Sequence, residues 1–395
     1  MENKRKNTML MALGIMAFLA NGDNYAVAPL LINISKDLNL TISTAAMSVT
    51  AYMLTFGLFT ILFGPLGDRY GKTKIINIAA FGTSIFSMLG AFAFNLPSLI
   101  FFRAMNGAFG AGIFPVTMAL VGESFDNSNR QKSIGKVMGL MFLGGASATA
   151  IGGALAYFGS WRAVYFLYGV AELIMAVALL KILPKSSGVI DKLEFISVYK
   201  TALSNKKFVS VVATIMLVGF SVFGSFTFSG KLVQSRTGYN VFYVGLILTL
   251  FGIATVIGGR KAPALRAKLK DNFLLFAGIL GGASLLTIAV TSNPIIIGVA
   301  LFGFGIAFIS MQSTLVMTAQ ETMPKLRGTA MSLASFNMFV GGAIGTSING
   351  KIINVASIGT VFLVAAVAIF LAGTIGAIVI KRINSQKSLT QSLIG

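Results

Sequence analysis

The sequence has no cysteine and no histidine among its 395 residues. Without cysteine the chain cannot form disulfides or use thiolate chemistry, and without histidine it lacks the commonest ligand of zinc and related metals. Imidazole is also the side chain that normally exchanges protons near neutral pH. Any proton carrier in this protein must therefore be a carboxyl group whose surroundings favour its protonated form, and we expect neither a metal nor another cofactor.

Charged residues are also scarce. They make up 11% of the chain, about half the fraction that is usual for soluble domains, whereas hydrophobic residues make up 55%. The 44 glycines are a frequency typical of membrane helices. The formal net charge is +20, but the basic residues form no stripe with interleaved aromatic residues, so we expect no nucleic-acid partner. This composition predicts an all-α polytopic membrane protein surrounded by a lipid bilayer.

The apolar residues fall into twelve segments that are long enough to cross a bilayer as helices. Several breaks between them are short, which makes the neighbouring helices antiparallel. The basic N-terminus leads into a first segment that is too long for a signal peptide, and we interpret it as a retained span. The segments lie near residues 8–33, 43–66, 75–95, 98–122, 135–158, 162–183, 208–230, 241–259, 273–292, 295–318, 329–354 and 358–380.

The loops that connect these segments differ strongly in basic residues. If both termini are cytoplasmic, 25 of the 31 Lys and Arg residues fall on the cytoplasmic side and 5 on the outer side, with Arg103 left inside a span. Cytoplasmic loops of membrane proteins carry an excess of Lys and Arg. The asymmetry predicts a multi-pass protein of the cell (cytoplasmic) membrane with both termini in the cytoplasm.

The two halves of the chain are related by an internal repeat. Residues 144–153 (GGASATAIGG) and 341–350 (GGAIGTSING) share six of ten residues at an offset of 197, about half the chain length. We therefore expect an N-terminal six-helix bundle over 1–183, a cytoplasmic linker over 184–207, a C-terminal six-helix bundle over 208–380 and a cytoplasmic tail over 381–395. Small residues in the repeat let helices touch closely. The candidates for this packing are Gly144, Gly152, Gly153, Gly341 and Gly345.

One charged stretch, Gly64–Ile75 with the sequence GPLGDRYGKTKI, lies between the second and third apolar segments. We expect its glycines to let the backbone turn tightly. The stretch resembles the loop between helices 2 and 3 of major facilitator superfamily transporters, whose pattern is Gly-x-Leu-x-Asp-Arg-x-Gly-Arg/Lys-x-Lys/Arg. The resemblance covers nearly the whole chain and implies the major facilitator fold, in which twelve transmembrane helices form two pseudo-symmetric six-helix bundles. The matching residues are Gly64, Leu66, Asp68, Arg69, Gly71, Lys72 and Lys74.

By this resemblance the stretch acts as a conformational latch between the two bundles. Glu123 and Arg130, with their counterparts Glu321 and Arg327, resemble charges that the fold repeats at cytoplasmic helix ends. We expect Asp68 to pair with basic residues or with the start of the eleventh helix. The implied latch residues are Gly64, Asp68, Arg69, Gly71, Lys72, Glu123, Arg130, Glu321 and Arg327.

Asp23 lies deep in the first predicted span, where a charge costs ~2.5–3.5 kcal/mol on insertion scales. Its expected partner is Arg103 in the fourth span, which with Gly107 resembles the family's helix-4 motif Arg-x-x-x-Gly, whose arginine is associated with proton coupling. Protonation of Asp23 would release Arg103, and a cationic substrate could compete for the same carboxylate. The alternative is an ion pair that only holds the N-terminal bundle together.

Other mid-span residues are candidates for lining the substrate cavity. The second half has no acidic residue inside a span, so we expect proton coupling in the first half and substrate fit to depend on the second. Glu172 is interpreted as structural, with proton carriage as the alternative, and Lys351 as a cation that reaches the membrane surface, with anion binding as the alternative. The cavity candidates are Asn24, Asn106, Phe223, Phe308, Gln312 and Asn337.

The resemblance is closest to the twelve-helix drug:proton antiporter branch, whose first helix resembles DNYAVAPLLINISKDLNLT at Asp23–Thr41. The branch's helix-5 motif is altered, because Ala148 and Thr149 replace its Gly-Pro. The leading hypothesis is a monomeric secondary transporter that uses a proton gradient to export small apolar or cationic compounds by alternating access. The alternatives are a proton-coupled carrier of an organic anion, sugar or nucleobase and, less favoured, a non-transporting receptor or lipid-handling protein. We expect no enzymatic activity, because the spans hold no convergent pair of catalytic groups.

Overall fold

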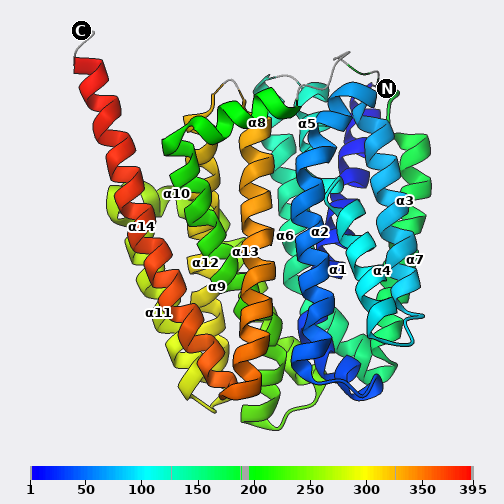
Figure 1. The fold of residues 1–395 in the computed structure, drawn as a ribbon. Helices are drawn as coiled ribbons and strands as arrows, with labels where there is room; N and C mark the ends of the chain where they lie inside the picture. The colour runs from blue at the N-terminus through cyan, green and yellow to red at the C-terminus, as the bar shows by residue number, and fades with distance from the viewer. Residues whose placement is uncertain (1, 126, 187, 189–194, 325, 393–395) are drawn as a thin grey trace.

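The computed structural model describes residues 2–125, 127–186, 188, 195–324 and 326–392, which are almost entirely helical, with no strand among them (Figure 1). The first half contains α1 Glu2–Asp37, α2 Ile42–Tyr70, α3 Lys72–Gly90, α4 Leu96–Gly110, α5 Ile113–Ser124, α6 Asn127–Phe158 and α7 Trp161–Ile182. The second half contains α8 Phe195–Ser204, α9 Lys206–Thr237, α10 Val241–Leu269, the 3-10 turn η1 Lys270–Asn272, α11 Phe273–Val290, α12 Pro294–Thr322, α13 Arg327–Val355 and α14 Ile358–Ser392.

These helices are membrane spans by length and composition. Eleven helical stretches of the described chain are long and apolar enough to cross a bilayer. One of them, Val241–Val290, contains both α10 and α11, while Leu96–Ser124 joins α4 and α5 into a single span. The described helices therefore provide twelve crossings, which confirms the fold class that the sequence predicts.

The fourth span is broken between α4 and α5, a feature that the sequence segments did not predict. Pro115 has no N–H to donate to the carbonyl of Ala111, so the helical hydrogen-bond ladder is interrupted there. A side chain at Gly112 would lie 2.9 Å from Ala79 and 3.0 Å from Phe63. The kink thus brings the backbone of this span close to α2 and α3.

The charged stretch Gly64–Ile75 is more helical than the sequence suggested. α2 continues through Tyr70 and α3 begins at Lys72, so the turn consists of Gly71 alone, with φ of 92°. That value lies in the region that favours glycine. A side chain at Gly71 would also collide with the carbonyl of Ser186, whose hydroxyl accepts a 2.9 Å bond from the Thr73 N–H.

The two termini lie at the same end of the molecule, which we call the termini face, and the other end is the opposite face (Figure 1). α8 lies across the termini face, within the stretch that the sequence assigned to a linker. The repeat is visible in the helix packing. Gly144 of α6 would, with a side chain, strike the Phe18 carbonyl of α1, and Gly341 of α13 would likewise strike the Met216 carbonyl of α9. The equivalent glycines therefore pack equivalent helix pairs in the two halves.

The remaining small residues of the repeat have similar positions. Gly152 faces the Ala26 backbone of α1, and Gly345 faces the Phe220 backbone of α9. Gly153 instead joins the halves, since a side chain there would lie 2.7 Å from the Val241 carbonyl of α10. This contact places α6 and α10 backbone to backbone across the interface between the halves.

Candidate functional site

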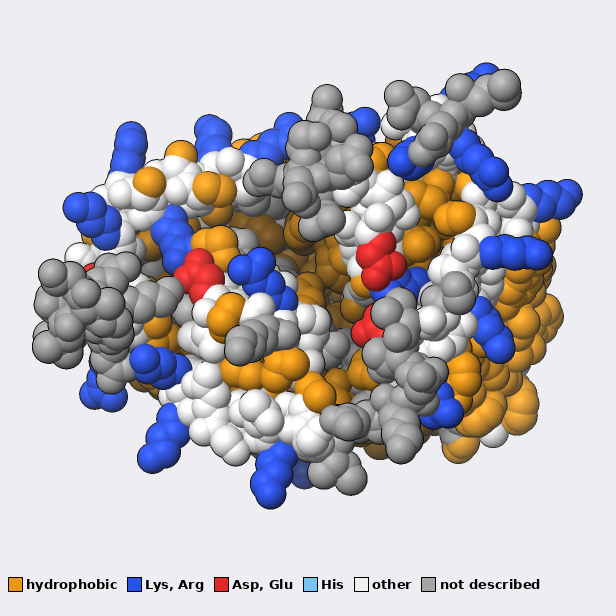
Figure 2. Space-filling model, turned by 90° about the horizontal axis from the view of Figure 1, so that it is seen from above, with side chains coloured by type: hydrophobic (Ala, Val, Ile, Leu, Met, Phe, Trp, Pro, Cys, Tyr) orange, Lys and Arg blue, Asp and Glu red, His pale blue; other side chains and the backbone are white. Residues whose placement is uncertain are grey.

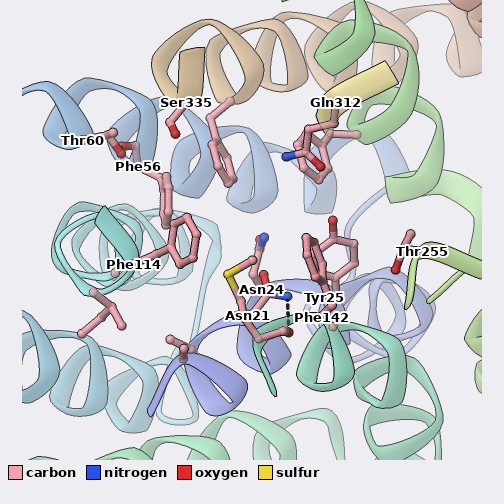
Figure 3. Close-up of a pocket in the computed structure, with 18 of the residues that line it drawn as sticks. Asn21, Asn24, Tyr25, Phe56, Thr60, Phe114, Phe142, Thr255, Gln312 and Ser335 are labelled. Atoms are coloured by element: carbon pink, nitrogen blue, oxygen red, sulfur yellow. Dashed lines mark hydrogen bonds between the residues drawn. The ribbon is translucent and has the colours of Figure 1, made fainter. Parts of the chain in front are cut away.

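A cavity of about 130 Å³ lies between the two halves (Figure 3). Asn21, Asn24 and Tyr25 reach it from α1, Gln312 from α12 and Thr255 from α10, so both halves contribute side chains. Every lining residue is uncharged. The aromatic lining residues are Tyr25, Tyr52, Phe56, Phe114, Phe142, Phe223, Phe251, Phe308 and Phe339, and the polar ones are Asn21, Asn24, Thr60, Thr255, Gln312 and Ser335.

The cavity continues toward the termini face. A second space of about 510 Å³ shares Phe114, Pro115 and Met331 with the first, and we call it the vestibule. Asp68 lines it from the first half and Arg327 from the second. Seen from the termini face, hydrophobic side chains are visible in the central hollow and Lys and Arg side chains surround its rim (Figure 2). A molecule in the cavity thus has a route to the termini face.

The cavity is closed toward the opposite face. The ring of Tyr25 packs on Phe226 with a centroid distance of 5.9 Å, and Phe226 packs on Phe251 at 4.5 Å. Beyond these rings, a side chain on Gly230 would lie 2.5 Å from the Ala28 carbonyl. Such close backbone contact between α1 and α9 leaves no path for a solute. The structure therefore has one open and one closed end.

The acid and base that the sequence singled out in the spans meet in the first half. Asp23 of α1 and Arg103 of α4 are each 1% exposed. Arg103 Nη1 lies 3.4 Å from Asp23 Oδ2 and 3.2 Å from Asn106 Oδ1. Asn106 Nδ2 in turn donates to the carbonyl and hydroxyl of Thr83 on α3. The buried charges are thus compensated by a pair with polar support from a third helix.

Aromatic rings separate this ion pair from the cavity. The guanidinium carbon of Arg103 lies 4.4 Å from the ring centroid of Tyr52 and 5.2 Å from that of Tyr165. Both distances are within the range of cation–π attraction. Tyr52 also lines the cavity. The Tyr52 ring therefore contacts Arg103 and also borders the cavity, so a molecule bound in the cavity and the ion pair can affect one another through it.

Four of the predicted latch residues, Gly64, Asp68, Lys72 and Arg327, line the vestibule. Lys72 Nζ lies 3.0 Å from Asp68 and 2.8 Å from Glu123, so these charges join α2, α3 and α5 within the first half. A side chain at Gly64 would lie 3.5 Å from Ser332 in the second half. Arg69 and Glu321 do not line it: the guanidinium carbon of Arg69 lies 5.1 Å from the ring centroid of Tyr70, and Glu321 is exposed. Arg130 belongs to α6, but its side chain lies outside the described residues.

The predicted cavity residues divide into two groups. Asn24, Phe223, Phe308 and Gln312 line the cavity. Asn106 and Asn337 do not: Asn106 is part of the Arg103 network, and Asn337 Nδ2 donates to the Leu333 carbonyl of its own helix. Lys351 is exposed and does not line the cavity.

Sequence reasoning missed two tyrosines of the site, Tyr25 and Tyr52. Tyr25 directly follows the predicted cavity residue Asn24, and Tyr52 is 2% exposed beneath Arg103. An aromatic residue in an apolar helix carries no signal of its own, because lipid-facing and cavity-facing positions have similar composition. Only the packing of the helices distinguishes these two rings from the others.

Comparison with known proteins places the chain in a wide family. Residues 13–346 match the Major Facilitator Superfamily. The chain is 23% identical over 364 residues to a bicyclomycin resistance protein homolog of Haemophilus influenzae, covering 87% of this chain and 89% of that protein. It is 26% identical over 285 residues to the multidrug efflux pump LfrA of Mycolicibacterium smegmatis, covering 69% of this chain and 53% of the pump. A mutant of the nucleoside transporter NupG has a similar fold, with a TM-score of 0.79 at 13% identity, covering 94% of this chain and 99% of that one.

Proposed function

Since the chain belongs to the Major Facilitator Superfamily, we propose that it is a proton-coupled antiporter that exports small apolar or cationic compounds from the cytoplasm. The observation that carries this proposal is the buried Asp23–Arg103 pair beside an aromatic cavity, with the ring of Tyr52 packed on Arg103 and lining that cavity. A proton on Asp23 removes the attraction that holds Arg103, and a substrate against Tyr52 acts on the same guanidinium. Two ligands that compete for one charge network are the simplest basis for antiport.

The lining of the cavity supports this substrate class. Aromatic faces attract apolar molecules by burial and organic cations by their quadrupole. Phe223 and Phe339 stack at 5.3 Å and Phe339 also stacks on Phe56 at 4.0 Å, which gives a flat apolar wall. The names of two relatives, a bicyclomycin resistance protein homolog and a multidrug efflux pump, are consistent with this substrate class.

Export also requires an orientation. We place the termini face in the cytoplasm, because 25 of the 31 Lys and Arg residues fall in segments predicted for that side. The vestibule then opens to the cytoplasm, and the Tyr25–Phe226 contact closes the outer side. Rocking of the two halves about the cavity would exchange the open and closed ends. The working unit is the monomer, since each chain contains both halves and the cavity between them.

The second candidate is a proton-coupled carrier of a neutral physiological solute. The amides of Asn21, Asn24 and Gln312 favour it, because they can bind hydroxyl or amide groups without carrying charge. An organic anion fits less well: Lys351 lies outside the cavity, and Arg236 Nη2 donates to the Ala289 carbonyl at 2.8 Å.

The test is uptake of fluorescent lipophilic cations and neutral dyes into inverted membrane vesicles under an imposed pH gradient. We expect uptake by the wild type that collapses when the gradient is dissipated. Asp23→Asn should lower gradient-driven uptake by at least about 100-fold, the range for loss of a proton-transfer group. Asp271→Asn is the matched control, because Asp271 is a half-buried acid outside the ion-pair centre and accepts a hydrogen bond from Asn384 at the termini face. Full gradient-driven uptake by Asp23→Asn would contradict the proposal.

A further inference from the structure

Glu172 of α7 is a second acid buried in the first half. It is 0% exposed, and neither of its carboxyl oxygens has a hydrogen-bond partner among the described residues. α7 packs tightly on α3 beside it, since a side chain at Gly169 would lie 2.5 Å from Met88. A carboxylate without donors in so dry a place is costly, whereas the neutral acid is cheaper to bury. Glu172 is therefore a group whose charge depends on its neighbours.

The neighbours of Glu172 belong to the ion pair already described. Glu172 shares one face of α7 with Tyr165 and Tyr168, seven and four residues earlier in the helix. That face meets the ion pair, because the guanidinium carbon of Arg103 lies 5.2 Å from the ring of Tyr165 and a side chain on Gly22 would lie 3.0 Å from the Tyr168 hydroxyl. Between Ile75 and Gly90 the facing helix α3 has no ionisable residue. The centre thus contains two carboxyl groups and one guanidinium. It is electrically neutral only when one of the two carboxyls holds a proton.

Tyr168 lies one helical turn before Glu172 on α7 and reaches toward α1 near Asp23. A side chain on Gly22, next to Asp23, would be 3.0 Å from the Tyr168 hydroxyl, and that hydroxyl has no partner in the described part of the chain. Asp23 Oδ1 is also buried without a partner there. A hydroxyl can accept one proton while it donates its own. Tyr168 is thus placed to connect the carboxyls.

We propose that Glu172 is a second proton-binding site of the coupling centre and alternates with Asp23 as the counterion of Arg103. In this state Asp23, whose Oδ2 lies 3.4 Å from Arg103 Nη1, is the ionised partner, and the proposal assigns the proton to Glu172. When Asp23 takes up a proton on an oxygen, Glu172 loses its proton from the O–H bond and its carboxylate compensates Arg103. The total charge of the centre is unchanged. The inference deepens the proposed function, in which this centre couples proton movement to export.

The experiment is infrared spectroscopy of the full chain reconstituted in lipid vesicles at neutral pH. A protonated carboxylic acid has a carbonyl stretching band that a carboxylate lacks, and the Glu172 band is assigned by its loss in Glu172→Gln. The decisive variant is Asp23→Asn, which leaves Glu172 as the only buried acid among the residues that the structure describes. We expect Glu172 to ionise and its band to disappear. Asp271→Asn, at the termini face, should keep the band.

Two results would overturn the proposal. One is a wild type without the Glu172 band, and the other is Asp23→Asn with the band intact throughout the pH range in which the protein stays folded. Circular dichroism and thermal unfolding identify folded variants, and Asp23→Ser serves if Asp23→Asn does not fold. The readout needs no transport. If Asp23→Asn loses the band but vesicles with the wild-type protein take up no compound, the Glu172 site stands and the exporter assignment fails. If the wild type exports but Asp23→Asn keeps the band, the exporter assignment stands and the Glu172 site fails.

Discussion

Gln312 has a side-chain carbonyl that is buried at the cavity without a hydrogen-bond partner among the described residues. An unsatisfied buried acceptor costs ~1–3 kcal/mol, so its natural partner is a donor on the bound molecule. We predict that Gln312→Leu weakens binding of compounds with hydroxyl or amide donors by roughly tenfold, while purely apolar compounds bind as before. The measurement is ligand-induced quenching of the single tryptophan, or calorimetry, across a matched compound series.

Asn337→Leu is the control for that prediction. Asn337 is another mid-span amide, but it donates to Leu333 of its own helix and does not line the cavity. Its replacement should leave both classes of compound unaffected. Equal losses for polar and apolar compounds in Gln312→Leu would mean that the residue only shapes the cavity.

These two amides illustrate what sequence can and cannot predict about single residues. Asp23 and Arg103 stood out because a buried charge is costly and must be compensated, and the structure brings them within 3.4 Å of each other. Amides carry a smaller cost, which their own helix can offset, so Gln312 and Asn337 looked alike. The rotation of each helix about its axis decides which amide meets the cavity, and that rotation depends on packing against neighbours.

At the scale of elements, the linker helix α8 is attached to α2 by a hydrogen bond that Pro65 of α2 makes possible. Pro65 has no N–H, so the carbonyl of Ile61 has lost its partner within α2. The Tyr199 hydroxyl of α8 donates to that carbonyl at 2.8 Å. Burial raises the pKa of Tyr199 to about 12, so the hydroxyl keeps its proton at physiological pH. The linker between the halves is thus held at the vestibule, which Tyr199 also lines.

We predict that Tyr199→Phe destabilises the attachment of α8 by about 1–3 kcal/mol, because the Ile61 carbonyl becomes unsatisfied. The expected result is faster proteolysis of the chain near 184–207 with nearly unchanged unfolding of the bundles. Tyr157→Phe is a fair comparison, since Tyr157 is exposed at the end of α6 and should show neither effect. Identical cleavage of Tyr199→Phe and wild type would contradict the role of this bond.

The ends of helices were predictable where the composition of the sequence changes from apolar to polar. They were not predictable where contacts with distant parts of the chain determine where a helix ends. The twelve spans follow from apolar length, and the break in the fourth span had a visible signal in Pro115. The shape of the charged stretch Gly64–Ile75 had no such signal in the sequence. Its three glycines predicted a tight turn that all of them share, yet only Gly71 leaves the helix, at the point where the Pro184–Ser186 backbone packs after α7. Contacts between residues so far apart in sequence are not visible in a local pattern.

At the scale of the molecule, we expect Asp68 to affect turnover and to leave substrate binding unchanged. With the vestibule open, Asp68 pairs with Lys72 of its own half, and its side chain remains half-exposed. Arg327, at the start of α13, lines the same vestibule from the other half. Closing the vestibule would bring the Asp68 carboxylate toward this cation and toward a helix N-terminus, both of which attract negative charge. We therefore expect Asp68 to stabilise the closed vestibule more than the open one.

We predict that Asp68→Asn slows turnover by roughly two- to fivefold, from a loss of about 0.3–1 kcal/mol at the helix start. Substrate affinity in the open state should not change, because Asp68 does not line the cavity. Equilibrium binding to purified protein and initial rates in vesicles measure the two quantities on the same preparation. Arg327→Gln should have the same effect, and the double variant should be little worse than either single one, since both remove one interaction. Weaker binding at unchanged turnover would place Asp68 in substrate recognition instead of in the movement of the two halves.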